Sequence, residues 1–198
     1  MSRFIESICL KDGKLQNIEY HNARLNRTIK EVLNKDTDFK LENLISISKN
    51  LQNGIYKVRV IYYKDIEEIE IQPYNFRRRD TLKIVFSDLN YRYKYEDRNI
   101  LNRLFEKRGG CDDILIVKND RPTDTFASNI VFFDGERWFT PVFPLLRGTK
   151  RQLLLDKKII LEKDIKLSEL KNFKGFRLIN AMLDWEDSYI PITNIKGF

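Results

Sequence analysis

At 198 residues the chain can bury a core of its own, and 42% hydrophobic with 33% charged residues is typical of a folded globular protein, not a disordered one. The net charge of +7 arises from 36 basic and 29 acidic residues that are interleaved, with Arg77-Arg78-Arg79 as the one compact basic cluster. This interleaving disfavours nucleic-acid binding, and an anionic small substrate or a phosphate cofactor accounts for the excess charge equally well.

The chain has few residues of the types that make metal or disulfide sites. Cys9 and Cys111 lie far apart without metal-ligand spacing, and His21 is the single histidine, which argues against a zinc site or a Ser-His-Asp site. The N-terminal sequence becomes charged too soon for a signal peptide, and no apolar run approaches membrane-spanning length. We therefore expect a cytoplasmic protein with no bound metal, no membrane association and no nucleic-acid partner.

The first half of the chain mixes short strands with amphipathic helices. Lys11-Asp12-Gly13-Lys14 is a turn signal between two short strands, and Gly54 ends a helical pattern before a strand whose apolar residues alternate with polar ones. The expected strands cover 4–10, 15–18, 56–62, 66–71 and 82–86, and the expected helices cover 21–33 and 41–51.

The second half begins with a helical pattern at 96–107 that stops at Gly109-Gly110. Strands are expected at 113–117, 129–133, 137–140 and 176–179, a helix from near Gln152, and a short helix within 163–170. Because strands and helices do not alternate regularly as βαβ units, the pattern indicates an α+β protein. We expect two lobes, 1–87 and 88–198, with a hinge near residues 87–90.

Several polar residues could carry chemistry, but none stands out alone. Lys94 has the sequence context of an ordinary solvated lysine, Asp124 that of a turn or capping residue, and Asn129 that of a strand edge. Gly148-Thr149-Lys150 opens a helix and could seat a phosphate on backbone N–H groups, although it lacks the glycine spacing of a P-loop.

The order of these residues is more specific. Over nearly the whole chain it resembles the class IV aminotransferases, also called fold type IV pyridoxal 5'-phosphate (PLP) enzymes. The matching segments are Phe4-Ile5-Glu6-Ser7-Ile8, Asp12-Gly13, His21-Asn22-Ala23-Arg24-Leu25, Lys94-Tyr95-Glu96-Asp97-Arg98, Gly110-Cys111-Asp112-Asp113-Ile114-Leu115, Thr123-Asp124 through Ile130, Thr140-Pro141 and Gly148-Thr149-Lys150-Arg151-Gln152.

The resemblance implies a two-lobed fold of the D-amino-acid aminotransferase type with an abbreviated N-terminal lobe. It also implies a PLP site in which Lys94 bonds covalently to the cofactor and acts as the base. The other cofactor-binding residues that it implies are Arg24, Thr149 and Lys150 at the phosphate, Asp124 at the pyridine nitrogen, and Asn129. Asp124 stands where the family has glutamate, and Lys150 where it usually has threonine or methionine.

Within the family, Leu178-Ile179-Asn180-Ala181-Met182 resembles the 4-amino-4-deoxychorismate lyases, which form 4-aminobenzoate and pyruvate for folate synthesis. Ser7 would then relay a proton, and Arg59 and Asn180 would bind the small amino substrate. The alternatives are an aminotransferase for branched-chain or D-amino acids, and a non-catalytic relative or basic binding module. The family also implies a homodimer.

Overall fold

The computed structural model describes residues 2–187 and 189–197, which form two compact units. Unit 1 contains residues up to 76 together with 93–97, and unit 2 contains 77–92 together with the described residues from 98 onward. These divisions differ from the boundary expected between residues 87 and 88. The difference arises because Leu82–Phe86 pairs with strands of unit 2, whereas Tyr93–Asp97 bonds to the first strand of unit 1.

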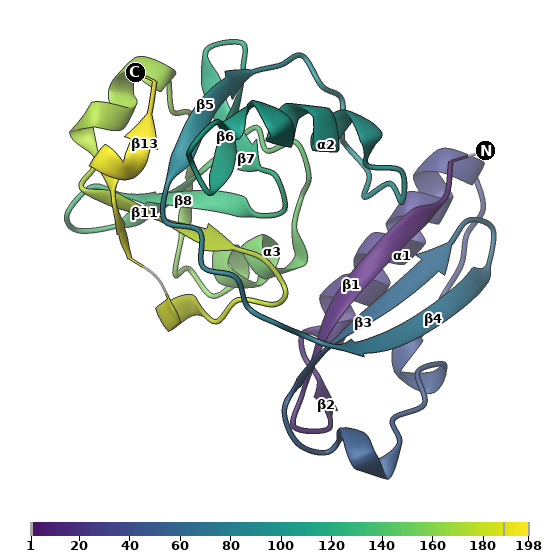
Figure 1. Cartoon of the computed structure of the whole chain (residues 1–198). Helices are drawn as coiled ribbons and strands as arrows, with labels where there is room; N and C mark the ends of the chain where they lie inside the picture. The colour runs from purple at the N-terminus through teal and green to yellow at the C-terminus, as the bar shows by residue number, and fades with distance from the viewer. Residues whose placement is uncertain (1, 188, 198) are drawn as a thin grey trace. The chain divides into compact units, whose positions relative to one another are not determined.

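Unit 1 is built on a four-stranded antiparallel sheet with the order β2-β1-β3-β4 (Figure 1). The expected hairpin and the two following strands are confirmed, although the second strand is only two residues long. The strands are β1 (Phe4–Lys11), β2 (Lys14–Leu15), β3 (Ile55–Tyr62) and β4 (Ile66–Pro73). In β3 the alternation is the expected one, because Tyr56, Val58, Val60 and Tyr62 all belong to the hydrophobic core of the unit.

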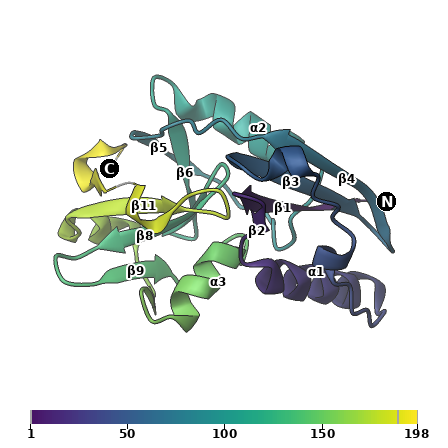
Figure 2. The ribbon, with the colours of Figure 1, turned by 90° about the horizontal axis from the view of Figure 1, so that it is seen from below.

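A single long helix, α1 (Ile18–Leu33), covers one face of this sheet (Figure 2). Leu25 and Ile29 are its deepest residues and pack against the buried side of β1 and β3. The helix begins three residues before the expected start. Asn17 and Asn34 flank it in the left-handed region, with φ of 53° and 52°, a conformation that asparagine tolerates better than most residues.

The prediction of a helix over 41–51 is wrong. Only two 3-10 turns form there, η1 (Leu41–Asn43) and η2 (Lys49–Leu51). Side-chain amides of α1 bond the backbone just before and at the start of this segment: Asn22 Oδ1 accepts from the Leu41 N–H at 3.0 Å, and Asn26 bonds both backbone groups of Phe39.

Unit 2 is built on a nine-stranded mixed sheet in which β10-β9-β8-β7-β6-β5-β13 follow one another. The strands are β5 (Leu82–Phe86), β6 (Asp113–Lys118), β7 (Arg121–Thr125), β8 (Asn129–Phe133), β9 (Trp138–Pro141), β10 (Leu161–Lys163), β11 (Gly175–Ile179), β12 (Ile190–Pro191) and β13 (Ile195–Lys196). β11 also pairs with β8, so β8 is hydrogen-bonded to more than two strands. This junction places the ends of β7, β8 and β11 close to one another.

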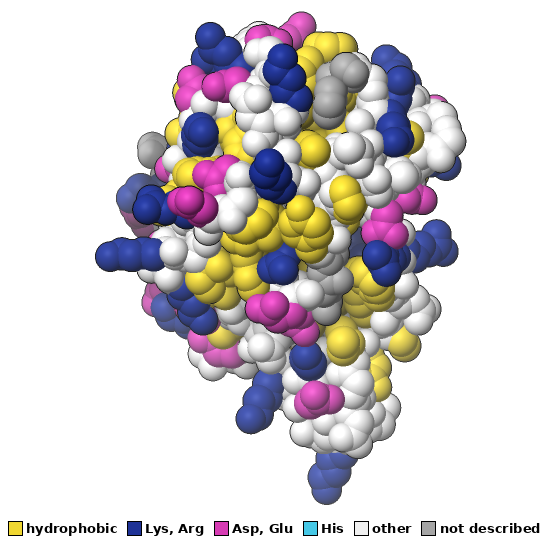
Figure 3. Space-filling model, turned by 90° about the vertical axis from the view of Figure 1, so that its left-hand side faces the viewer, with side chains coloured by type: hydrophobic (Ala, Val, Ile, Leu, Met, Phe, Trp, Pro, Cys, Tyr) yellow, Lys and Arg dark blue, Asp and Glu magenta, His cyan; other side chains and the backbone are white. Residues whose placement is uncertain are grey.

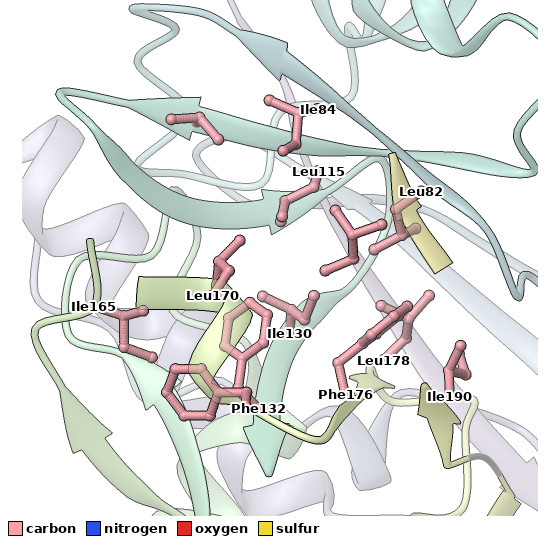
Figure 4. Close-up of a cluster of buried hydrophobic side chains, with 13 residues drawn as sticks. Leu82, Ile84, Leu115, Ile130, Phe132, Ile165, Leu170, Phe176, Leu178 and Ile190 are labelled. Carbon is pink, nitrogen blue, oxygen red and sulfur yellow. The ribbon is translucent and has the colours of Figure 1, made fainter. Parts of the chain in front are cut away.

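The main core of unit 2 lies between side chains of β5, β6, β8 and β11 (Figure 4). Ile130 and Phe132 of β8 point into this core, whereas Val131 points the other way into a smaller cluster with Leu154 and Ile179. Because residues of a strand alternate between the two faces, both faces of β8 are covered by apolar side chains. Leu154 belongs to α3 (Thr149–Asp156), which therefore packs beside β8 and fixes the position of its own N-terminus.

The other helical segments of unit 2 are short: α2 (Asn99–Phe105), then η3 (Glu106–Arg108), η4 (Leu167–Asn172), η5 (Trp185–Asp187) and η6 (Ile192–Asn194). The helix expected from Glu96 thus starts three residues later, after the segment that belongs to unit 1. Within the described residues, no helix is long and apolar enough to cross a bilayer. On the face in Figure 3, basic and acidic side chains are interspersed, as the interleaved sequence predicts.

Candidate active-site residues

Lys94 lies in a short irregular segment of unit 1 that runs alongside the start of β1. The N–H of Ile5 donates to the Lys94 carbonyl at 2.9 Å, and the N–H of Glu96 donates to the carbonyl of Arg3 at 2.9 Å. Between these bonds, Tyr95 forms a bridge with Phe4, and their rings lie 5.3 Å apart between centroids. The backbone that carries Lys94 is therefore anchored to unit 1 at the lysine itself and over the two residues that follow it.

A buried charged cluster lies beneath β1, where Glu6 meets α1. Arg24 donates from Nε to Glu6 Oε1 at 2.8 Å and from Nη2 to Oε2 at 2.5 Å, while Nδ1 of His21 lies 2.6 Å from Oε2. Such a two-point contact is the strongest geometry for an arginine–carboxylate pair. Glu6 thus fixes the orientation of Arg24, a role that the sequence did not reveal although Glu6 belongs to the matched first segment.

The ionisation of this cluster follows from burial and from its charges. Burial alone would raise the pKa of Glu6, but the charge of Arg24 and the contacts with His21 and Arg24 hold it down to about 2. Burial lowers the pKa of His21 despite the carboxylate beside it, and the positive charges of Arg24 and Lys94 lower it further. Lys94 therefore lies close enough to this cluster for its charge to be felt by the imidazole.

Ser7 and Arg59 are direct partners in the ladder between β1 and β3. Opposite residues of an antiparallel pair share one face of the sheet, so these two side chains are neighbours on the face away from α1. The guanidinium of Arg59 donates to Glu70 Oε2 at 3.1 Å and to Glu96 Oε1 at 3.0 Å. A substrate carboxylate at Arg59 would have to compete with these two side chains.

In unit 2, Asp124 is a fully buried carboxylate held by N–H donors. It lies opposite Asn129 in the pairing of β7 with β8. Asn129 Nδ2 donates to Asp124 Oδ1 at 2.8 Å and to the Leu146 carbonyl at 2.8 Å, and the Leu146 N–H donates to Asp124 Oδ2 at 2.8 Å. Burial raises the pKa of Asp124 to about 7 in spite of these donors and of the charge of Arg151.

The strand that carries Asp124 was not expected, and the residue is neither a turn nor a cap. The sequence of β7, Arg-Pro-Thr-Asp-Thr, lacks the alternation of apolar and polar residues that predicts a strand. Its residues Pro122 through Thr125 are nevertheless all buried between β6 and β8. Placement in a covered strand, not at the surface, is what desolvates the carboxylate.

The N-terminus of α3 lies next to this carboxylate network. Gly148 precedes the helix without a side-chain cap, and Thr149, its first residue, is buried. A Cβ at position 148 would come within 2.1 Å of Asn129 Oδ1, so glycine permits the close approach between the helix start and Asn129. The first N–H groups of a helix have no partner within the helix and carry its positive dipole end, which suits an anion.

Two further residues of the expected site region, Asn180 and Lys150, belong to unit 2. Asn180, directly after β11, donates from Nδ2 to Ser128 Oγ at 2.9 Å and accepts the Met182 N–H at 2.8 Å. It therefore connects the end of β11 with the turn that precedes Asn129. Lys150, the second residue of α3, is half-buried, with its backbone in the first helical turn.

The residues predicted to hold PLP are of chemical types that fit it, considered within each unit separately. Unit 1 contains a primary amine at Lys94, and unit 2 contains a buried carboxylate at Asp124 and a helix N-terminus at Thr149. Among the described residues, no group of three or more histidine, cysteine, aspartate or glutamate side chains could hold a metal ion.

The model of the class IV amino-transferase family matches residues 3–194, nearly the full chain. The chain belongs to the class IV aminotransferase family. It is therefore a PLP-dependent enzyme, and the expected α+β family fold is confirmed. Of the residues predicted for the cofactor site, Lys94 and Arg24 belong to unit 1, and Asp124, Asn129 and the start of α3 belong to unit 2.

Two proteins are similar to this chain over most of its length. A protein of Haemophilus influenzae, itself uncharacterized, is 37% identical over 187 residues, covering 92% of this chain and 98% of its own length. A crystal structure from Haemophilus somnus, provisionally named a 4-amino-4-deoxychorismate lyase, is 32% identical with a TM-score of 0.86, covering 92% of this chain and 97% of its own.

Two solved structures of lower sequence identity are similar to this chain in fold alone. One is a provisionally named amino-acid aminotransferase from Mesorhizobium loti, 18% identical, with a TM-score of 0.79 and 99% of both chains covered. Another is the PLP-bound form of a hypothetical aminotransferase from Mycobacterium tuberculosis, 17% identical, with a TM-score of 0.78, covering 98% of this chain and 81% of its own.

Proposed function

We propose that this class IV enzyme is a 4-amino-4-deoxychorismate lyase that forms 4-aminobenzoate and pyruvate. The observation that carries the proposal is the likeness to the Haemophilus somnus protein, at 32% identity over 92% of this chain and 97% of the other. The segment Asn180-Ala181-Met182 supports it, because it has the lyase pattern and because the Asn180 side chain is built into unit 2 by two hydrogen bonds.

Lys94 is proposed as the residue that bonds to PLP and then acts as the base. When bound, PLP supplies an electron sink for the carbon that carries the substrate nitrogen. The amine of Lys94 would remove the proton from that carbon, a task for which a positioned lysine with a neutral amine is suited. The anchoring of Lys94 to β1 supports this role, since a base must be held in place relative to the proton it takes.

The remaining cofactor contacts are proposed for residues of both units. Asp124 would hold a proton between its carboxylate and the pyridine nitrogen, and Asn129 would keep that carboxylate oriented through its bond to Oδ1. Arg24 would donate to the phosphate from α1. Thr149 and Lys150 would do so from the first turn of α3, where backbone N–H groups and the helix dipole favour an anion.

On the substrate side, Ser7 is proposed to pass a proton through Oγ to the departing three-carbon unit. Arg59, its ladder partner, is the proposed contact for a substrate carboxylate, in exchange for one of its present partners. Asn180 is proposed as a second contact to the substrate. The protein would act in the cytoplasm as a homodimer, and sedimentation equilibrium of the purified chain tests the dimer.

The first experiment tests the lysine. Purified protein mixed with PLP should absorb in the visible, and reduction with borohydride should fix the cofactor on the peptide that contains Lys94. Lys94→Ala should lose both signals, whereas Lys30→Ala should keep them, because Lys30 is an exposed residue of α1 paired only with Asp36. A Lys94→Ala protein that is still labelled would place the covalent bond on another lysine.

The second experiment separates lyase from aminotransferase. With 4-amino-4-deoxychorismate, the enzyme should release 4-aminobenzoate and pyruvate in equal amounts. With D-alanine or leucine and a keto-acid acceptor, it should release far less product. If the amino acids are the only substrates turned over, the lyase proposal is wrong and the chain is an aminotransferase of the same family.

A further inference from the structure

Five charged side chains form one line of ion pairs across unit 1. In order they are Glu70, Arg59, Glu96, Arg3 and Glu67. The distances between successive partners are 3.1, 3.0, 2.6 and 3.5 Å. Arg3 and Arg59 come from the sheet region of β1 and β3, and Glu67 and Glu70 come from β4. Glu96 is the central member and comes from the segment that carries Lys94.

Glu96 is the single member of this line that the Lys94 segment contributes. If its carboxylate is removed, Arg59 keeps Glu70 and Arg3 keeps Glu67, so each arginine of the sheet retains a partner. What is lost is the connection between the sheet and the segment. Two ion pairs of this line therefore hold residues 93–97 to the sheet, and both are made by the side chain of Glu96.

The partial burial of Glu96 and Arg59 favours a measurable contribution of their ion pair to holding this segment. The side chains of Glu96 and Arg59 are only 21% and 25% exposed, so solvent screens their pair less than it screens a surface pair. The Glu96 N–H also donates to the Arg3 carbonyl, so backbone and side chain of the same residue hold the same neighbour. Tyr93 and Tyr95, which flank Lys94 in the chain, both pack against Phe4.

We propose that Glu96 is a positioning residue for Lys94: its ion pairs with Arg59 and Arg3 fix the reactive lysine on the first strand of unit 1. Arg59 then acts through Glu96 as part of this positioning line, in addition to or in place of substrate binding. The inference rests on the proposed function of Lys94. It is specific to Glu96, since neither Glu67 nor Glu70 belongs to the segment.

Amide hydrogen exchange tests the positioning directly, both with and without PLP. In Glu96→Ala, the amides of Ile5 and of residue 96 should exchange roughly threefold to tenfold faster, because the two ion pairs no longer oppose local opening of the segment. The amide of Ile29, deep in α1, should keep its exchange rate. Glu96→Asp should restore part of the protection, because aspartate keeps the charge on a shorter side chain.

Glu70→Gln is the matched control. It removes the outer partner of Arg59 on β4 and leaves the bond from Arg59 to Glu96 in place, so the exchange of Ile5 and of residue 96 should stay within about twofold of the wild type. If Glu70→Gln and Glu96→Ala accelerate these amides equally, Glu96 has no special role. Equal acceleration at Ile29 in Glu96→Ala would also overturn the proposal, because the effect would be a general loss of stability.

Kinetics of the PLP-loaded enzyme distinguish positioning from substrate binding. If Glu96 positions the base, Glu96→Ala should lower kcat with little change in KM, and should change the pH dependence of the visible band. If Glu96 merely occupies an arginine that the substrate needs, the variant should lower KM and leave kcat unchanged. A wild-type protein that never bonds PLP at Lys94 would refute the proposed function, while the exchange experiment without PLP would still test the role of Glu96.

Discussion

Asp124 provides the sharpest test of the site, because its ionisation should change with folding. The carboxyl is fully buried in β7 and receives N–H donors from Asn129 and Leu146, yet its pKa rises to about 7 from an ordinary value of 3.8, chiefly through burial. Asp124→Asn keeps the size of the side chain but removes the titration. Comparing the two proteins therefore isolates the pH dependence that this group contributes.

The sign follows from proton binding. Between about pH 4 and pH 7 the folded protein holds a proton on Asp124 that the unfolded chain has released, so the free energy of unfolding must fall as pH rises through this window. The stabilisation is complete below the unfolded pKa and absent above the folded pKa. A difference of about three between the two pKa values, at about 1.36 kcal/mol each, corresponds to roughly 4 kcal/mol.

Urea unfolding of the PLP-free proteins at several pH values measures this difference. Relative to Asp124→Asn, the wild type should lose roughly 4 kcal/mol of stability between about pH 4 and pH 8. A constant offset of roughly 1–3 kcal/mol is expected in addition, because asparagine offers one oxygen to the two N–H donors. A difference between the proteins that stays flat with pH would refute a raised pKa at Asp124. PLP should stabilise the wild type more than the variant at about pH 8, since a protonated ring nitrogen would compensate the carboxylate.

Three further substitutions test other parts of the structure. Gly148→Ala should lower stability by roughly 1–3 kcal/mol and weaken PLP binding, because the new Cβ would displace Asn129; unfolding and a PLP titration measure both. Glu6→Gln should cost roughly 3–5 kcal/mol at neutral pH by leaving Arg24 buried without its carboxylate. This loss should shrink as pH falls from about 4.5 toward about 2, where wild-type Glu6 itself becomes protonated, and an equal loss at both pH values would contradict the low pKa. Asn26→Ala should cost roughly 2–3 kcal/mol by releasing the segment around Phe39, with faster exchange at the Phe39 amide as the specific sign.

Sequence periodicity predicted the regular part of the fold well. In unit 1, β1, β3, β4 and α1 appear close to where alternation or helical spacing placed them, because each contributes side chains to the hydrophobic core of the unit. In unit 2, β5 and β8 match their expected ranges to the residue. These segments are apolar enough that their own burial decides their conformation.

The errors have a common physical origin, which is that bonds to distant residues decided the local structure. The segment 41–51 has helical spacing, but its start is bonded to a side-chain amide of α1 and only two short 3-10 turns form. The expected helix from Glu96 starts only at Asn99, because backbone bonds of residues 94 and 96 to Ile5 and Arg3 tie the preceding segment to unit 1. Neither set of bonds is visible in a local window of sequence.

The residues of the candidate site also could not be identified from local sequence alone. Lys94, Asp124 and Asn129 were selected because of their order relative to a known family, not because their neighbourhoods are unusual. Glu6 and Glu96 lie in the same matched segments, yet the sequence assigned them no role because their importance depends on partners on α1 and β3. A buried carboxylate can be inferred from an alternating strand such as β1, where Glu6 occupies an apolar position between Phe4 and Ile8, and that signal was present.

The ion pair with Glu6 limits how much Arg24 could contribute to phosphate binding. Glu6 is ionised with a pKa of about 2, and the pKa of His21 is lowered, so near neutral pH the cluster of Glu6, His21 and Arg24 carries no net charge. Arg24 would therefore offer a phosphate a donor of fixed direction but little excess positive charge. The attraction for the anion would then come mainly from the N-terminus of α3 and from Lys150. If Lys150 binds the phosphate as proposed, it would supply a positive charge that Arg24 lacks because of its ion pair with Glu6.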